Sequence, residues 1–404
     1  MEYQTASDYN VQNNFQSQTN FLEVSVINEI IQNYEQIESK CKGQCGEEIV
    51  NERIKQVAYA KILCNVYNKD ITYLIKAYAQ LGIAYLDIEF YEQAQEHLLN
   101  AFKLNENLSD EDNLNMKEYQ IKILINLSKC YLENDKLEAA LQISQRSLKM
   151  NQTLFGESHV SNADIYYVLA KINTKLKKYK EAIENLRCMF ETYEKIYGFD
   201  SEKTAKICME IGQIYELWNN LNDAIEYYNN SYKIWEKIIE DDNYEVLYSL
   251  AIKLSELYAK IDKGDESYKI LSMVDEKYGD KVNRSIKDRV VFQRCKIKAC
   301  SYIKDMDLYL KENLKLEEIL NETSENQKTL AKTCISIGYI YLENGNKDKC
   351  LEYLNKAKKI FTVNGDMKLA NEIQGRIYKI QKNEETENNN EENNNDFEQE
   401  QDME

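Results

Sequence analysis

Residues 206–236 read KICMEIGQIYELWNNLNDAIEYYNNSYKIWE, and this segment is the clearest indication of how the chain folds. Apolar and small side chains recur at intervals of three and four residues on both sides of the polar pair Asn219-Asn220. This spacing is typical of amphipathic helices rather than strands. Gly212 and Ala224 are small where two helices would cross. The segment therefore predicts a helical hairpin whose helices approach closely at these two residues.

The same pattern recurs along the chain, as expected because one hairpin cannot bury its own apolar face. In five copies a second small residue follows the first by 12 positions, at 82 and 94, 128 and 140, 170 and 182, 212 and 224, and 338 and 350. Less regular copies occur at Ser255 and around Ala299. The sequence thus predicts an all-α solenoid of about seven helix-turn-helix repeats. Tyrosines that recur at helical spacing are expected in the repeat core: Tyr85, Tyr131, Tyr215, Tyr258, Tyr302 and Tyr341.

This order of small and large residues resembles the tetratricopeptide repeat (TPR), a helix-turn-helix unit of about 34 residues. The copies here are 39 to 46 residues apart, a longer period that resembles the kinesin light chain subtype. The Gly-x-x-His-Pro loop of that subtype is similar to residues 156–160, where Val160 replaces the proline, and Ala163 and Leu169-Ala170 follow as in the subtype. The resemblance implies a right-handed superhelical solenoid that binds other proteins.

Residues 57–86 resemble a narrower family. The segments VAYAKIL at 57–63 and AYAQLGIAYL at 77–86 are similar to the opening of tetratricopeptide repeat protein twenty-three and its close relative. Asn68 stands where that family has Gly, and the tryptophan of the family is absent. The family is linked to cilia, where it serves in protein assemblies. The resemblance implies a subunit of a larger ciliary, axonemal or microtubule-associated assembly.

Composition excludes several classes of function. The formal net charge is -18 and no basic face is apparent. Binding to the phosphate backbone of a nucleic acid requires such a face, so nucleic acid is not an expected partner. No apolar run approaches the length of a membrane span. The ten cysteines are scattered, and most lie in apolar helical stripes, which indicates a reducing compartment such as the cytoplasm.

The chain divides into five expected regions. A polar, disordered N-terminus (1–19) precedes an N-terminal helical hairpin (20–70). The TPR-like repeat array covers 71–363, and a C-terminal capping helix covers 364–382. Residues 383–404 form an acidic Asn/Glu tail with too few apolar groups to fold.

We expect no catalytic residues, no cofactor and no metal site. The two histidines are His97, within a helix, and His159, in a loop where a structural hydrogen bond is the expected role. Cys41 and Cys45 have the spacing of two zinc ligands, but no second Cys or His pair lies nearby.

The remaining candidate site is the groove lined by the first helix of each repeat. In each of these helices, the residues three positions before and one position after the small residue are expected to be exposed in the groove. Around Gly82 these residues are Ala79 and Ile83. Lys129, Lys171 and Lys175 would form a positive strip for an acidic peptide, and the alternative is an ordinary solvated helix face. The candidate partner-binding residues are Ile125, Asn126, Lys129, Tyr167, Lys171, Lys175, Met209 and Gln213.

These observations favour a non-enzymatic protein-interaction scaffold or adaptor in the cytoplasm, within the cilium or axoneme cytoskeleton. The alternative is a cargo adaptor like kinesin light chain that binds acidic peptides in the TPR groove. Such an adaptor should carry a coiled coil for its motor partner, and the first 70 residues show no sustained heptads.

Overall fold

The computed structural model describes residues 24–108, 114–239, 244–279, 285–323 and 326–382. Within these ranges the chain is helical and has no strand, so the all-α expectation is confirmed. The disorder expected in 1–19 and 383–404 lies outside the described residues. Two compact units, Met1–Trp218 and Asn219–Glu404, divide the expected repeat array, and each is described by itself.

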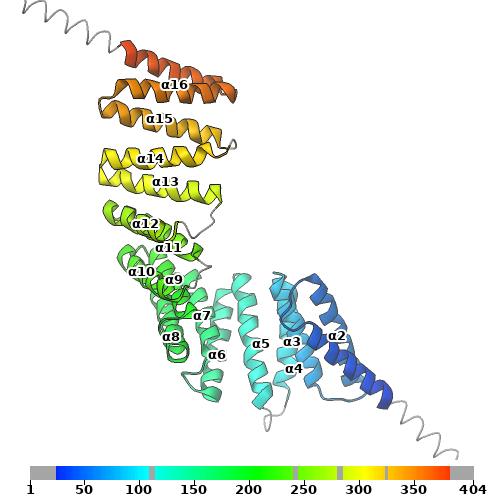
Figure 1. The fold of residues 1–404 in the computed structure, drawn as a ribbon. Coiled ribbons are helices and arrows are strands. Elements are labelled where there is room, and N and C mark those ends of the chain that lie inside the picture. Colours follow the sequence, from blue (N-terminus) through cyan, green and yellow to red (C-terminus); the bar gives the residue numbers. More distant parts are fainter. Residues whose placement is uncertain (1–23, 109–113, 240–243, 280–284, 324–325, 383–404) are drawn as a thin grey trace, which may run out of the picture. The chain divides into compact units, whose positions relative to one another are not determined.

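The first unit contains a helix at residues 24–40 and then eight labelled helices (Figure 1). Neighbours in the chain pack together: α2 on α3, α3 on α4, and so on to α8 on α9. The region expected as the N-terminal hairpin holds the helix of residues 24–40 and α2. The labelled helices are α2 (Glu47–Asn65), α3 (Thr72–Asp87), α4 (Tyr91–Glu106), α5 (Leu114–Glu133), α6 (Leu137–Phe155), α7 (Asn162–Lys175), α8 (Tyr179–Tyr197) and α9 (Glu202–Leu217).

The second unit repeats this arrangement, with α11 packed on α12, α13 on α14 and α15 on α16. A last helix at residues 367–382 covers the end of this stack, where Ala370, Ile373 and Ile377 join one apolar cluster with Ala357 and Phe361. The helices are α10 (Leu221–Ile238), α11 (Glu245–Lys260), α12 (Gly264–Tyr278), α13 (Ile286–Ile303), α14 (Met306–Asn321), α15 (Gln327–Glu343) and α16 (Lys347–Val363).

Small residues stand where paired helices cross, as the 12-residue spacing predicts. A Cβ added to Gly82 would lie 2.6 Å from Cγ of Leu98 and 3.1 Å from the carbonyl oxygen of Ala94. In the copy at Ser255, the partner is Ser267, whose hydroxyl donates to the Ser255 carbonyl at 2.9 Å. The crossings at Gly82 and Ser255 therefore depend on side chains small enough to admit the facing helix.

Each turn within a repeat contains one residue in the left-handed backbone region, seven positions after the small residue. After five of these residues, Glu89, Asp135, Lys177, Asp262 and Gly345, the next amide donates to a carbonyl five positions earlier, as Lys136 does to Tyr131 at 2.8 Å. The turn closes the first helix and sets the start of the second. The left-handed residues are Glu89, Asp135, Lys177, Asn219, Asp262, Lys304 and Gly345.

The turn at Lys304 corrects the register of the least regular repeat. Counting back seven positions places its small position at Ile297, not at Ala299 as the sequence pattern indicated. Tyr302 is consequently 43% exposed and is not a core residue, whereas Cys300 takes the position of the core tyrosine and is buried.

Candidate functional site

The candidate site is built on the first helices of the repeats in the first unit, α3, α5, α7 and α9. α3 contacts α5, and α5 contacts α7, while a hydrogen bond from Tyr167 to Glu210 joins α7 to α9. We call this surface the first-helix face. Its positions are counted from the small residue of each helix: Gly82, Ser128, Ala170 and Gly212.

Positions three before the small residue are less exposed than the sequence suggested. Ala79 is buried, and Ile125, Tyr167 and Met209 are half-buried. Ile125 packs against a cluster that contains Ile165 of α7, because successive first helices contact each other along this seam. The expectation of exposure is therefore wrong at Ala79.

Positions one after the small residue reach the surface more fully. Lys171 and Gln213 are exposed, and Ile83 and Lys129 are half-buried. The remaining candidate, Asn126, donates its side-chain amide to the carbonyl of Lys122 at 2.9 Å, so one of its two amide hydrogens is used within its own helix.

Lys171 interacts with groups from three successive repeats. Its amino group lies 5.0 Å from the ring centre of Tyr167, whose hydroxyl donates to Glu210 at 3.2 Å. Burial alone would lower the pKa of Lys171, but the hydroxyl of Tyr167 and the charges of Glu210 and Glu133 outweigh burial and raise it. The charges of Glu133 and Glu210, from the two neighbouring repeats, therefore favour the cationic form of Lys171.

Lys175 and Lys129 also have partners in the preceding repeat. The amino group of Lys175 donates to the carbonyl of Leu132 at 3.0 Å and lies 3.9 Å from the carboxylate of Glu133. Burial raises the pKa of Asp87, while the charge of Lys129 acts to lower it. The three lysines thus face acidic groups of their own chain, and the strip is balanced in charge rather than positive.

The acidic partners Asp87, Glu133 and Glu210 were missed by sequence reasoning. Asp87 and Glu133 each stand five positions after the small residue of their own helix. This position is one helical turn beyond the position that Lys129 occupies in its repeat. That shared position was the available signal, because a residue there can reach the next repeat.

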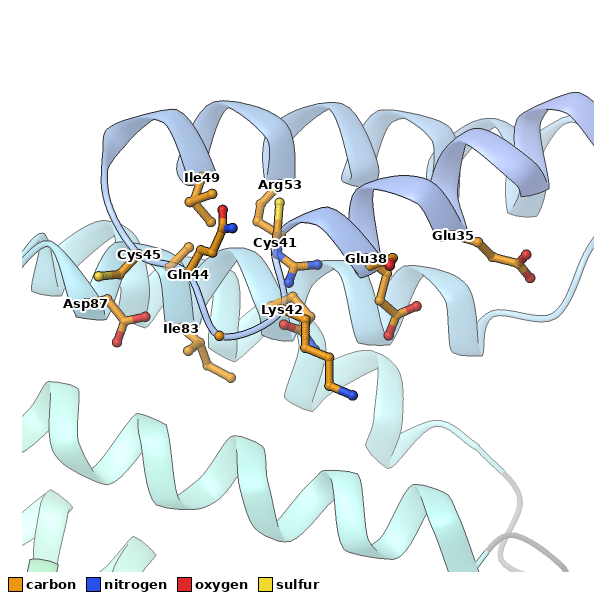
Figure 2. Close-up of a pocket in the computed structure, with 14 residues that line it drawn as sticks. Glu35, Glu38, Cys41, Lys42, Gln44, Cys45, Ile49, Arg53, Ile83 and Asp87 are labelled. Atoms are coloured by element: carbon orange, nitrogen blue, oxygen red, sulfur yellow. The ribbon is translucent and has the colours of Figure 1, made fainter.

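A hollow of about 850 Å³ lies where the first-helix face meets the N-terminal helices. Its lining comes from the helix of residues 24–40, the loop that follows, the start of α2, and α3. Figure 2 shows Glu38 and Lys42 on one side and Ile83 and Asp87 on the other. Because Ile83 and Asp87 belong to the first-helix face, the hollow continues that surface.

One buried cation, Arg53 of α2, lines this hollow. Only 4% of it is exposed, and its Nη1 donates to the side-chain oxygen of Gln56 at 2.7 Å. Gln56 in turn donates to the carbonyl of Tyr34 at 3.5 Å, and the Tyr34 hydroxyl donates to the carbonyl of Tyr73. These bonds fix the position of the guanidinium.

The two histidines lie in aromatic surroundings. His97 stacks between Tyr78 and Tyr85, and burial lowers the pKa of its imidazole. His159 stacks on Phe155, and its Nδ1 lies 2.6 Å from the hydroxyl of Ser161. In the part of the chain that the structure describes, no three His, Cys, Asp or Glu side chains are grouped to hold a metal ion.

Cys41 is buried and Cys45 is exposed beside the hollow, and both are free thiols. Of the cysteines expected in apolar helical stripes, Cys130, Cys208, Cys334 and Cys350 are buried, whereas Cys64 is half-buried. Among the described helices, none has both the length and the apolar character needed to cross a membrane.

The repeat geometry agrees with comparisons to known proteins. The tetratricopeptide repeat family matches residues 119–195 and 166–237 in one form, and residues 331–362 in another. The chain contains tetratricopeptide repeats. TPR units stack into extended surfaces that bind other proteins.

Similar proteins share parts of this repeat array. A clustered mitochondria protein homolog from Candida albicans is 28% identical over 134 residues, which is 32% of this chain. The matched segment covers 10% of that relative, so this chain spans about a tenth of its length.

Two solved structures are also similar to parts of this chain. BtubC (BKLC) from P. vanneervenii has 16% identity and a TM-score of 0.49, over 59% of this chain and 93% of that one. A Podosopora anserina protein described as a kinesin light chain with nearly identical TPR-like repeats has 15% identity and a TM-score of 0.42. That match covers 51% of this chain and 97% of the other.

Proposed function

We propose that this chain is a non-enzymatic scaffold or adaptor that binds a segment of a partner protein on the first-helix face. The supporting observation is the row of side chains from successive repeats, in which Lys171 and Gln213 remain exposed. The proposed contact residues are Ile125, Asn126, Lys129, Tyr167, Lys171, Lys175, Met209 and Gln213.

The balance of charge on this face favours a partner segment that carries both signs. An acidic peptide at Lys129, Lys171 and Lys175 would also face Asp87, Glu133 and Glu210. A segment with alternating charge can pair with both the lysines and the carboxylates of this face. Binding then leaves neither kind of charge without a partner.

Proximity labelling with the intact chain tests the binding surface. Changing Lys171 and Gln213 together to Ala should remove the labelled partners, since both side chains are exposed on the proposed surface. The matched control changes Gln145 and Lys149, which are exposed on α6, to Ala. Retention of the same partners by both variants would place the contact elsewhere.

We further propose that the assembly is ciliary or axonemal, on the resemblance of residues 57–86 described above. A fluorescent fusion of the intact chain should then localise to cilia, with ciliary proteins among its labelled neighbours. The alternative, a cargo adaptor like kinesin light chain, is supported by the Phe155–His159 loop, and it requires a motor heavy chain among those neighbours. A diffuse distribution with neither set would contradict both assignments.

A further inference from the structure

Arg53 is a buried cation that lacks a carboxylate partner among the residues that the structure describes. In the described part of the chain, its side-chain hydrogen bond is to the neutral amide of Gln56. Among the residues that the structure describes, no carboxylate oxygen lies within 4.0 Å of its guanidinium. Removing a guanidinium from water costs free energy unless a counter-charge compensates. No counter-charge among the described residues therefore offsets the cost of burying the Arg53 guanidinium.

The unpaired guanidinium lines the hollow, where a ligand can reach it. Figure 2 shows Arg53 beside Cys41, near the loop that carries Lys42. The guanidinium has five N–H groups in a fixed plane, and Gln56 accepts from one of its two terminal nitrogens. A volume of about 850 Å³ is within the range of clefts that hold a small ligand.

We propose that Arg53 binds a carboxylate of a peptide segment whose remainder lies on the first-helix face. This assignment rests on the proposed function, because it extends the same surface to the N-terminal helices. A planar carboxylate can accept two parallel hydrogen bonds from a guanidinium. The carboxylate belongs to an Asp or Glu side chain within that segment.

The other charged groups of the hollow narrow the ligand further. Besides Lys42, three carboxylates line it, those of Glu35, Glu38 and Asp87, and they repel a doubly charged phosphate more than a singly charged carboxylate. The same three groups favour a Lys or Arg side chain a few residues from the bound carboxylate. The segment that fits the hollow therefore carries one acidic and one basic residue close together in sequence.

Binding of defined peptides to the full chain tests the proposal. The probes are fluorescein-labelled 12-residue peptides with one Glu and one Lys, placed one to six residues apart. Matched sets replace the Glu by Gln or by phosphoserine. At least one Glu spacing should bind, and Arg53→Met should weaken that binding by about tenfold or more, because the charged bidentate contact is lost. Lys55→Met is the control, since Lys55 is on the same helix, exposed, and paired with Glu52.

Several outcomes would overturn this assignment. These are equal affinity of the wild type and Arg53→Met, equal affinity of the Glu and Gln peptides, tighter binding of phosphoserine, or no binding by any peptide. Arg53→Lys keeps the positive charge but loses the planar guanidinium that can donate two parallel hydrogen bonds. This variant should also bind more weakly, and it is informative if Arg53→Met fails to fold. If changing Lys171 and Gln213 to Ala weakens a peptide that Arg53→Met does not affect, the first-helix face remains a binding surface and only the Arg53 site is wrong.

Discussion

The amino group of Lys175 on α7 lies 3.0 Å from the carbonyl oxygen of Leu132, one residue before the end of α5. The last carbonyls of a helix have no partner within that helix, and they carry partial negative charge. A cation placed there is therefore favourable. Lys175 joins two successive repeats at the point where the first helix of one repeat ends.

Changing Lys175 to Met should lower the free energy of unfolding by about 0.5–1 kcal/mol, because the contact is partly exposed and one carbonyl loses a charged donor. Urea denaturation followed by circular dichroism measures this difference. Lys122→Met is the control, since Lys122 pairs with Glu118 within α5 and joins no repeats. Equal effects of the two substitutions would mean that the contact with Leu132 adds nothing to stability.

Gly82 provides a sharper test of helix crossing. Replacing it with Ala places a methyl group 2.6 Å from Cγ of the fully buried Leu98, so the two helices must separate. We expect a loss of about 1–2 kcal/mol, after the better helix propensity of Ala is taken into account. The thermal midpoint of each variant measures the change.

Gly375 is the matched control for this crossing. It lies within the helix of residues 367–382, and a Cβ added there meets no atom within 4 Å. Gly375→Ala should therefore stabilise the chain by about 0.5–1 kcal/mol through helix propensity alone. A rise in the midpoint for both variants would show that α3 and α4 tolerate a larger residue at their crossing.

The success and failure of the sequence prediction have a common physical origin. Close packing at Gly82 and Gly338 restricts residue type, so the 12-residue spacing is visible in the sequence. At Ile297 the small residue is absent, and the register there could be found only from the turn at Lys304. The prediction of Ala299 failed because composition alone carried no turn signal at that repeat.

The charged neighbours of the candidate site could not be predicted in the same way. Lys171 and Glu133 are 38 positions apart, and their approach depends on how one repeat stacks on the next. Acidic residues are common throughout this chain, and Glu210 does not share the repeat position of Asp87 and Glu133, so the sequence gives no means of selecting Glu210 among them. The same reason hid Arg53, whose burial depends on the N-terminal helices packing over α3.

At a turn residue in the left-handed backbone region, we expect a substitution that stabilises the chain. Lys177 has φ 59°, a conformation that is strained for a residue with a Cβ. Lys177→Gly should raise the free energy of unfolding by about 0.5–1 kcal/mol. Lys178→Gly is the control, because Lys178 has φ -85° and no strain to release. Urea midpoints that fall for both variants would show that strain at this turn is negligible.

The second unit offers a test of pH dependence at Glu312 of α14. Its side chain is fully buried, and it accepts from Tyr268 at 3.0 Å and from Gln293 at 2.7 Å. Lys296, itself almost fully buried, lies 3.5 Å away, and Lys315 lies 3.1 Å away. Burial alone would raise the pKa of Glu312, but these hydrogen bonds and charges outweigh burial and hold it below the ordinary value of 4.5.

A carboxylate whose pKa is lower in the folded state binds protons less readily there than in the unfolded state. Its contribution to stability is therefore present above pH 4.5 and is lost as the pH falls through the folded pKa. Glu312→Gln should lower the free energy of unfolding at pH 7 by about 3 kcal/mol, because Lys296 loses one of its two carboxylate partners among the described residues and keeps Asp275. It should also reduce the loss of stability on acidification below pH 4.5. Urea denaturation at pH 7 and at successively lower pH measures both effects.

Glu322→Gln removes an exposed partner of Arg289 and should have a much smaller effect at pH 7. If the two variants are equally stable at pH 7, the buried cluster around Glu312 does not stabilise the second unit.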